Sequence, residues 1–269
     1  MPDNLILNIP HASTSLSGLY FSDGIYLAAA AGAVRQMLHD ELLPMTDWYT
    51  DELFINGIGT PIVAPVSRIV CDTERFRNDE DEPMSIIGMG VCYTRTHDLK
   101  YGIPRNQGHR ERTLCSIYDV HHRKLQEAVD SALMNHKTAL ILDCHSFSPV
   151  PLPYEPDRDP DRPDICIGTD PFHTPPELTQ QAVEFFRSKG YSVKTDSPYS
   201  GTIVPVKHLH RTGEVHSIMV ELNRGLYLKS GTSQKSDYFP ILKQHLALFE
   251  QLLIDFSACF VHNSKQESQ

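Results

Sequence analysis

Several side chains that could carry out chemistry lie at or just beyond the ends of short apolar segments. They form four clusters, in the segments LILNIPHAS, SRIVCDTERF, ALILDCHS and IMVELNRGLY. The residues concerned are His11, Asp72, Glu74, Arg75, Asp143, His145, Glu221, Asn223 and Arg224. Ligands of α/β proteins bind beyond the carboxyl ends of the strands, so residues in such places can meet in one site.

His11 and His145 are the candidate metal ligands. A catalytic zinc ion takes three protein ligands from His, Asp and Glu and leaves one position for water. Neutral imidazoles on stiff strand ends suit that role, and Asp143 could accept a hydrogen bond from a histidine and fix its tautomer. Alternatively, each histidine is only hydrogen-bonded within a packed loop. We expect one Zn²⁺ per chain, with cobalt, manganese and iron left open by affinity trends.

Alternating apolar and amphipathic segments must position these residues. The expected strands are Leu5–Ile9, Ile62–Ala64, Ile69–Cys71, Ala139–Asp143, Ile165–Gly168, Tyr191–Thr195 and Ile218–Leu222, and the expected helices are Gly24–Leu43, Ser116–Met134, Pro175–Ser188 and Tyr238–Phe256. This order predicts an α/β fold with three layers, α/β/α, around a central mixed, mostly parallel sheet. Arg77–Arg112 and Pro149–Pro163 are predicted as long loops, of the kind that close over an active site. No linker divides the chain, so we expect a single catalytic domain over residues 1–269.

Charge and composition limit the partners. The net charge of −10 argues against nucleic acid or an anionic membrane as a partner. The segment MPDNLILNIPHAS lacks the features of a signal peptide, and no stretch approaches the roughly 20 apolar residues of a membrane helix. The six cysteines form no CxxC pair, and several lie in apolar runs, which favours reduced, buried thiols. We therefore expect a cytoplasmic protein that acts on a small molecule.

The motifs also resemble those of a known family. IPHAS, SRIVCDTERF, DCHS, SPYSGTIVP and VELNRGLYL, in this order, are similar to N-formylglutamate amidohydrolases, from residue 5 to about 230. That family is related to zinc carboxypeptidases and aspartoacylase-type deacylases, which implies a zinc-exopeptidase (phosphorylase/hydrolase-like) fold. The resemblance implies that His11 and His145 bind zinc. It further implies that Arg75 belongs to an Asp-Leu-Asn-Arg-like box and that Glu221 is the general base.

The third metal ligand departs from the pattern of the relatives. Carboxypeptidase relatives have a Glu three residues after the first His, where this chain has Thr14. TDWYTDEL resembles an Asp-Trp segment of the family, so Asp47 is our first choice, Asp51 the second and a water the third. Asp47 could instead be a helix N-cap or a solvated loop acid. The arginine box reads Asp-Thr-Glu-Arg, which leaves the role of Glu74 open, including an outward orientation.

Amide hydrolysis needs a base for the attacking water and an acid for the leaving nitrogen, and one glutamate can serve as both. Glu221 lies in the apolar segment IMVEL, where an ionised carboxylate is costly to bury. It should therefore have a raised pKa or face a cation. The alternative role is a structural salt bridge to Arg224 or Arg75.

Binding a small anionic N-acyl amino acid, most simply N-formyl-L-glutamate, requires cations. Arg75 and Arg224 are the candidates because a guanidinium can hold a carboxylate with two parallel hydrogen bonds, and Arg75 could also stabilise the oxyanion. Arg68 and Arg211 are weaker candidates. Tyr199, in the turn SPYSGTI, could donate to a substrate oxygen or simply pack on the surface.

Two other functions remain open. A carboxypeptidase-like or cell-wall amidase activity would need Pro149–Pro163 to admit a peptide. The second is a non-catalytic module that binds a small molecule and has a degraded metal site, because Thr14 replaces an expected ligand.

Overall fold

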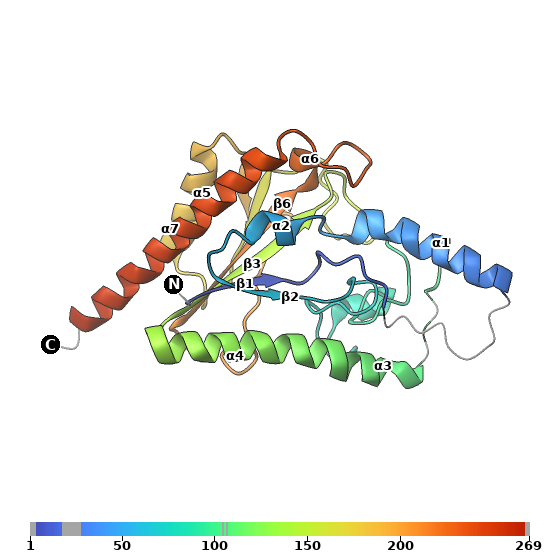
Figure 1. Ribbon diagram of the computed structural model, residues 1–269, viewed down its shortest axis with the longest axis horizontal. Coiled ribbons are helices and arrows are strands. Elements are labelled where there is room, and N and C mark those ends of the chain that lie inside the picture. The colour runs from blue at the N-terminus through green and yellow to red at the C-terminus, as the bar shows by residue number, and fades with distance from the viewer. Residues whose placement is uncertain (1–3, 18–27, 104, 106, 267–269) are drawn as a thin grey trace.

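A computed structural model describes residues 4–17, 28–103, 105 and 107–266 of the chain (Figure 1). Its strands are β1 (Leu5–Ile9), β2 (Thr60–Val63), β3 (Ala139–Phe147), β4 (Ile165–Gly168), β5 (Val193–Thr195) and β6 (Val215–Asn223). Its helices are α1 (Ala28–Met45), α2 (Thr50–Phe54), η1 (Pro83–Ile87), α3 (Gln107–Thr113), η2 (Leu114–Tyr118), α4 (Asp119–His136), α5 (Pro176–Ser188), α6 (Arg224–Tyr227) and α7 (Phe239–Gln266). Within the described residues, no helix is both long enough and apolar enough to cross a membrane.

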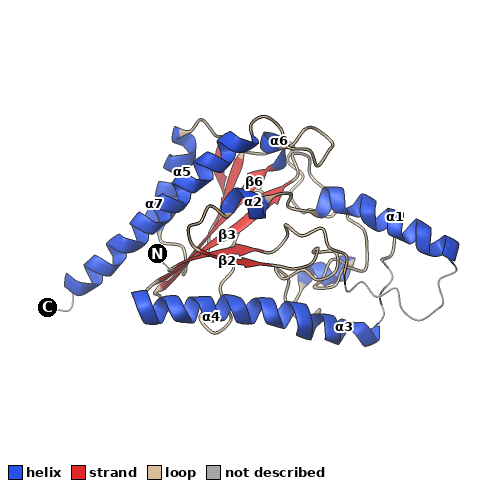
Figure 2. Ribbon diagram, viewed as in Figure 1, coloured by secondary structure: helices blue, strands red, loops and turns tan. Residues whose placement is uncertain are grey.

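The strands form a mixed sheet in the order β2-β1-β3-β6-β4-β5. The strands β2, β1, β3 and β6 run parallel, while β4 is antiparallel to β6 and parallel to β5. Figure 2 shows this sheet between α4 on one side and α2, α5 and α7 on the other. The predicted three-layer α/β/α fold with a mostly parallel sheet is therefore confirmed.

The two faces of the sheet follow from the alternation of side chains along β1. Leu5 and Leu7 pack in one apolar cluster with residues of α2, α5 and α7. Ile6 belongs to a different cluster, with Leu125 and Val129 of α4. Successive side chains of a strand point to opposite faces, so both faces of β1 are covered by helices. This burial on both faces explains the almost continuous apolar sequence of the strand.

The same register brings polar side chains together near the carboxyl edge of the sheet. Asn8 of β1 lies opposite Asp143 of β3, and His145 of β3 lies opposite Glu221 of β6. Residues opposite each other in parallel strands point to the same face, and these four share the face of Ile6, toward α4. The strand ends therefore gather residues that are far apart in the sequence.

The strand predicted at Ile69–Cys71 is wrong. The backbone N–H groups of Val70 and Cys71 both bond to the carbonyl oxygen of Ser67, which closes a turn. All three side chains of the segment are nonetheless buried, in a cluster with α1. A short apolar run signals burial, and here a turn, not a strand, provides it.

Other boundaries moved as well. The strands β3 and β6 are longer than predicted, so that His145 lies within a strand, as Glu221 was already predicted to do. The predicted loop Arg77–Arg112 contains the short helices η1 and α3, while Pro149–Pro163 is a loop as expected. The predicted start of the first helix, residues 24–27, lies outside the described residues.

Candidate metal and substrate site

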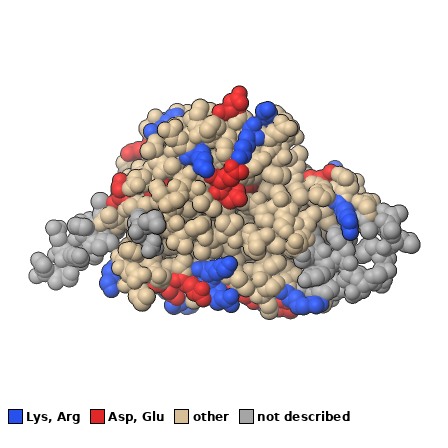
Figure 3. All heavy atoms as spheres, viewed as in Figure 1, with Lys and Arg blue, Asp and Glu red and all other residues tan. Residues whose placement is uncertain are grey.

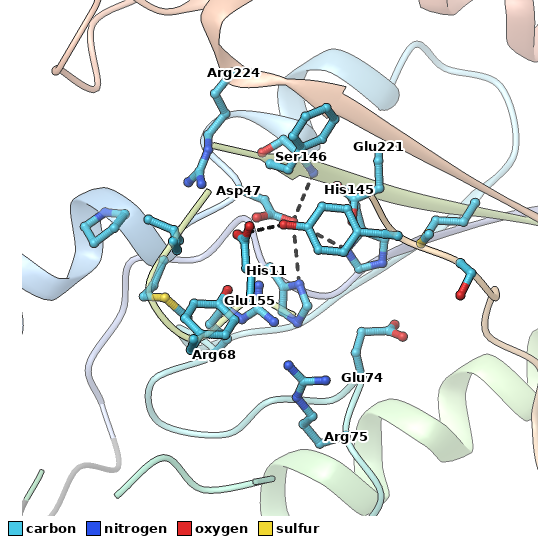
Figure 4. Close-up of a pocket in the computed structure, with 18 residues that line it drawn as sticks. His11, Asp47, Arg68, Glu74, Arg75, His145, Ser146, Glu155, Glu221 and Arg224 are labelled. Carbon is cyan, nitrogen blue, oxygen red and sulfur yellow. Dashed lines mark hydrogen bonds and ion pairs between the residues drawn. The ribbon is translucent and has the colours of Figure 1, made fainter. Parts of the chain in front are cut away.

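A cavity of about 210 Å³ lies at the carboxyl edge of the sheet. Its walls contain the first-choice residues proposed above as metal ligands, as the base and as substrate contacts: His11, Asp47, His145, Glu221, Arg75, Arg224 and Tyr199. Arg68 also lines it, whereas Asp51 and the exposed Arg211 do not. Figure 4 shows His11, Asp47 and His145 close together, with Arg224 and Arg75 directed toward them from separate elements of the fold.

His11, Asp47 and His145 converge at the base of this cavity. The Nδ1 atom of His11 lies 3.5 Å from Oδ2 of Asp47, and Nδ1 of His145 lies 3.4 Å from the same oxygen. The two ring centroids are 5.1 Å apart. One ligand atom from each of the three residues lies within 4.8 Å of the others, and all three residues are buried. This group could hold a metal ion.

Carboxylates on the far side of both rings fix which nitrogen faces Asp47. Nε2 of His11 is 2.8 Å from Oδ1 of Asp72, and Nε2 of His145 is 3.0 Å from Oδ1 of Asp143. If each Nε2 carries the proton, each Nδ1 presents a lone pair to the site. Nδ1 of His11 is buried without any hydrogen-bond partner, as expected of an atom placed to ligate a cation. The contact of Asp72 was not foreseen, although its place after an apolar run was noted.

The acidic residues around the two rings favour positive charge. Burial would raise the pKa of Asp47, but its close contacts with the rings of His11 and His145 hold that pKa well below its usual range. Burial would likewise lower the pKa of His145, but the charge of Asp143 raises it well above its usual value. A divalent cation would meet the same favourable field.

Glu221 is a buried carboxyl beside the histidine pair. Its Oε2 atom has no hydrogen-bond partner. Burial raises the pKa of Glu221 to about 8; the positive charge of His145 opposes this shift and the negative charge of Asp47 adds to it. A carboxyl of this kind can take up and release a proton near neutral pH, as a general acid and base must.

The three arginines of the cavity differ in how many hydrogen bonds they already make to protein groups. Arg68 is bound to Asp72 by two hydrogen bonds of 3.2 and 2.9 Å. Arg224 donates from Nη1 to the carbonyl oxygen of Thr46 at 2.6 Å. The Nε atom of Arg75 is buried and has no hydrogen-bond partner, with Asp72 Oδ2 at 3.7 Å. Arg75 is therefore the guanidinium with most capacity left for an anion.

The loop Pro149–Pro163 contributes three wall residues that the sequence did not single out, Leu152, Tyr154 and Glu155. The hydroxyl of Tyr199 donates to Oε1 of Glu155 at 2.8 Å, and Arg162 pairs with the other oxygen. Tyr199 thus anchors the loop and also lines the cavity, so its contact with a substrate stays a prediction. The only signal for this loop was its length, and that signal was correct in placing it over the site.

Glu74 points into the cavity, so the outward orientation considered above is wrong. Its Oε1 atom accepts a hydrogen bond of 2.6 Å from Nδ2 of Asn8, and the same nitrogen donates to Oδ1 of Asp143 at 2.9 Å. Glu74, Asp143 and His145 also have ligand atoms close enough for a cation. The amide nitrogen of Asn8 already bridges the two carboxyls there, so we assign no metal to that group.

Comparison with known proteins agrees with the motifs. The profile of the N-formylglutamate amidohydrolase family matches residues 3–228. The chain belongs to this family. Among curated proteins, none matches the chain.

Solved structures share the fold of this family member. A crystal structure of N-formylglutamate amidohydrolase from Ralstonia eutropha JMP134 superposes with a TM-score of 0.76 at 20% identity, covering 95% of this chain and 94% of the other. A gene product of Agrobacterium tumefaciens superposes with a TM-score of 0.56 at 17% identity, covering 98% and 92%. At these identities the likeness shows the fold alone.

Proposed function

We propose that this protein hydrolyses the amide of a small N-acyl amino acid, most simply N-formyl-L-glutamate to formate and glutamate. Family membership supports the reaction class. The observation that carries the proposal is the pair of imidazole Nδ1 atoms aimed at one oxygen of Asp47, with a buried carboxyl on the neighbouring strand.

The donor set fits one zinc ion. His11, His145 and Asp47 would supply two nitrogens and one oxygen, which leaves a position for water in a tetrahedral site. When bound, zinc lowers the pKa of a water molecule and polarises the substrate carbonyl. Thr14 is exposed and lies outside the cavity walls, so the ligand that carboxypeptidase relatives have at this position is replaced by Asp47. The relation to zinc carboxypeptidases remains a prediction.

Glu221 acts as the proton carrier in this proposal. Its unpartnered Oε2 takes a proton from the attacking water and returns it to the amide nitrogen as the carbon–nitrogen bond breaks. One water is consumed, and formate and the amino acid are released. The raised pKa of Glu221 suits both halves of this exchange.

Arg75 and Arg224 bind the carboxylates of the substrate, and Arg75 can also face the carbonyl oxygen as it gains charge. They line the cavity from two sides, with Arg224 above the histidine pair and Arg75 below it in Figure 4. Tyr199 acts indirectly here, by fixing Glu155 and its loop over the cavity. A cavity of about 210 Å³ suits a small dicarboxylate.

The test is metal content together with hydrolysis of N-formyl-L-glutamate. We expect about one zinc per chain and formate release that stops when the metal is removed and returns when zinc is added. The joint substitution His11→Ala and His145→Ala should lose both metal and activity, while His39→Ala, an exposed histidine of α1, should keep both. Full activity in metal-free protein would refute the mechanism.

A second candidate is hydrolysis of a peptide or a larger N-acyl amide, of the carboxypeptidase or cell-wall amidase kind. It is favoured by a neighbouring cavity of about 720 Å³ that shares Pro44 and Arg224 with the site. Formylated, acetylated and peptide substrates compared on one preparation would decide between the two. Binding without turnover of any of them in zinc-loaded protein would instead indicate the non-catalytic module.

A further inference from the structure

One carboxyl oxygen in the cavity has no role in the proposed hydrolysis. Glu74 lines the cavity, and within the described part of the chain no hydrogen bond reaches its Oε2 atom. Both oxygens of Glu155 are engaged, by Tyr199 and Arg162. Asp47 faces the two imidazoles, and Glu221 is the proton carrier. Glu74 is thus the remaining wall carboxyl that can accept a hydrogen bond from a ligand.

The position of this oxygen is fixed by buried residues behind it. Asn8 binds Oε1 of Glu74 at 2.6 Å, and its own Oδ1 lies 2.9 Å from Nε2 of His121. Burial, with a contribution from His122, lowers the pKa of His121 to about 3, so the ring is neutral and Nε2 donates its single proton to Asn8. Asn8 also donates to Asp143. Both polar atoms of the Asn8 side chain are therefore hydrogen-bonded, and the side-chain amide cannot flip without losing these bonds.

Glu74 and Arg75 are chain neighbours on one side of the cavity. Figure 4 shows both below the rings of His11 and His145, with the guanidinium directed into the cavity. One ligand atom of Glu74 lies within 4.8 Å of a ring nitrogen of His145. An acceptor and a guanidinium side by side, next to the metal ligands, match a substrate unit that has an N–H donor and a carboxylate on one carbon.

We infer that Glu74 and Arg75 together recognise the N–H and the α-carboxylate of an N-acyl α-amino acid, with Glu74 Oε2 accepting the hydrogen bond of the scissile amide. This inference rests on the proposed hydrolysis and adds a residue, Glu74, that selects substrates whose scissile amide carries an N–H. A carboxyl oxygen accepts a hydrogen bond whether or not the group is ionised, so the contact does not depend on its protonation. Asn8 and His121 are positioning residues that act through Glu74.

The test compares two substrates in two proteins: N-formyl-L-glutamate and its N-methyl analogue, in the wild type and in Glu74→Gln. The glutamine has the shape of the glutamate, and its oxygen must turn toward the Asn8 donor, so its NH₂ group faces the substrate N–H. We expect kcat/KM for N-formyl-L-glutamate to fall about 10- to 100-fold, because the buried N–H of the substrate is left without an acceptor. For the N-methyl analogue, which has no N–H, we expect less than a threefold change.

The control is Glu80→Gln, an exposed glutamate of the same loop, which should leave both values unchanged. An equal fall for both substrates in Glu74→Gln would overturn the inference, as would no fall at all. If Glu74→Gln does not fold, Glu74→Asp takes its place, because it keeps the acceptor but withdraws it by one methylene. It must then lower kcat/KM for N-formyl-L-glutamate more than kcat/KM for the N-methyl analogue. If zinc-loaded wild type does not hydrolyse N-formyl-L-glutamate, the proposed function fails instead, so the two failures are distinguishable.

Discussion

Two ends of the same sheet carry clusters of histidine and aspartate, and they differ in where the ring nitrogens of the histidines point. At the carboxyl edge, Nδ1 of His11 has no hydrogen-bond partner and shares the Asp47 oxygen with His145. At the opposite edge, His173 bonds through Nδ1 to the carbonyl oxygen of Val215, the first residue of β6.

His208 and His210, at the same end, are engaged as well. His173 accepts through Nε2 from the backbone of His210, whose own Nε2 binds Asp170. His208 bonds to Asp130 through one nitrogen and to Thr212 through the other. Residue types alone therefore do not identify a metal site. What distinguishes the first cluster is a pair of nitrogens whose opposite ring atoms are held by carboxylates and whose free sides converge.

The charge distribution at the surface adds nothing to this distinction. Figure 3 shows acidic and basic side chains interspersed over the visible face, while His11, Asp47, His145 and Glu221 are buried.

The largest effect should come from removing the proton carrier. Glu221→Gln keeps the shape of the side chain but cannot take up a proton, so kcat should fall about 10²- to 10⁴-fold while zinc stays bound. Steady-state assays of formate release, with metal analysis of the same preparation, measure both quantities. His210→Ala, at the opposite edge, should keep both zinc and kcat. Retained activity in Glu221→Gln would assign the base to another residue.

A smaller effect should come from the carboxylate behind His11. Asp72→Asn weakens the hydrogen bond to Nε2 of His11 and should lower zinc affinity about 10- to 100-fold, because a carboxylate bound to the far nitrogen orients and polarises a metal-bound imidazole. The comparison at the opposite edge is Asp170→Asn, which contacts His210 and should leave zinc affinity unchanged. Competition with a chromophoric chelator measures the affinity. Equal losses of zinc affinity in Asp72→Asn and Asp170→Asn would contradict the proposed difference between the two ends of the sheet.

The smallest effect on activity should come from Glu250, a buried carboxyl outside the proposed site. Glu250 of α7 resembles Glu221: burial raises its pKa to about 8, and its Oε2 has no hydrogen-bond partner. Between pH 4.5, its usual pKa, and pH 8, the folded state keeps a proton that the unfolded state has lost. The free energy of unfolding therefore falls as the pH rises through this range.

Glu250→Gln has no such proton to lose. It should match the wild type near pH 5 and exceed its free energy of unfolding by about 3 kcal/mol at pH 8. Urea unfolding at the two pH values measures the difference, and activity should not change. A stability difference that is the same at both pH values would contradict the raised pKa.

The sequence predicted most of the fold because the strands are buried on both faces and their apolar runs are clear. The error at Ile69–Cys71 has the same origin, since burial of a turn produces the same pattern. In the site, His11, His145, Glu221, Arg75 and Arg224 were placed by their positions at strand ends, and all line the cavity. Their roles remain proposals.

The remaining site features could not be predicted from local patterns. The contact of Asp72 with His11 joins residues 61 positions apart, and Asn8 with His121 joins residues 113 apart. The orientation of Glu74 depends on that distant Asn8, so nothing in the segment DTER reveals it. Asp47 was chosen only through the family resemblance, since a loop acid has no periodicity of its own.

The most direct test of the central claim is a crystal structure of zinc-loaded protein with anomalous difference data at the zinc edge. We predict one strong peak within about 2.0–2.2 Å of Nδ1 of His11, Nδ1 of His145 and an oxygen of Asp47. A peak bonded elsewhere, or ligation through Nε2 of either ring, would contradict the account.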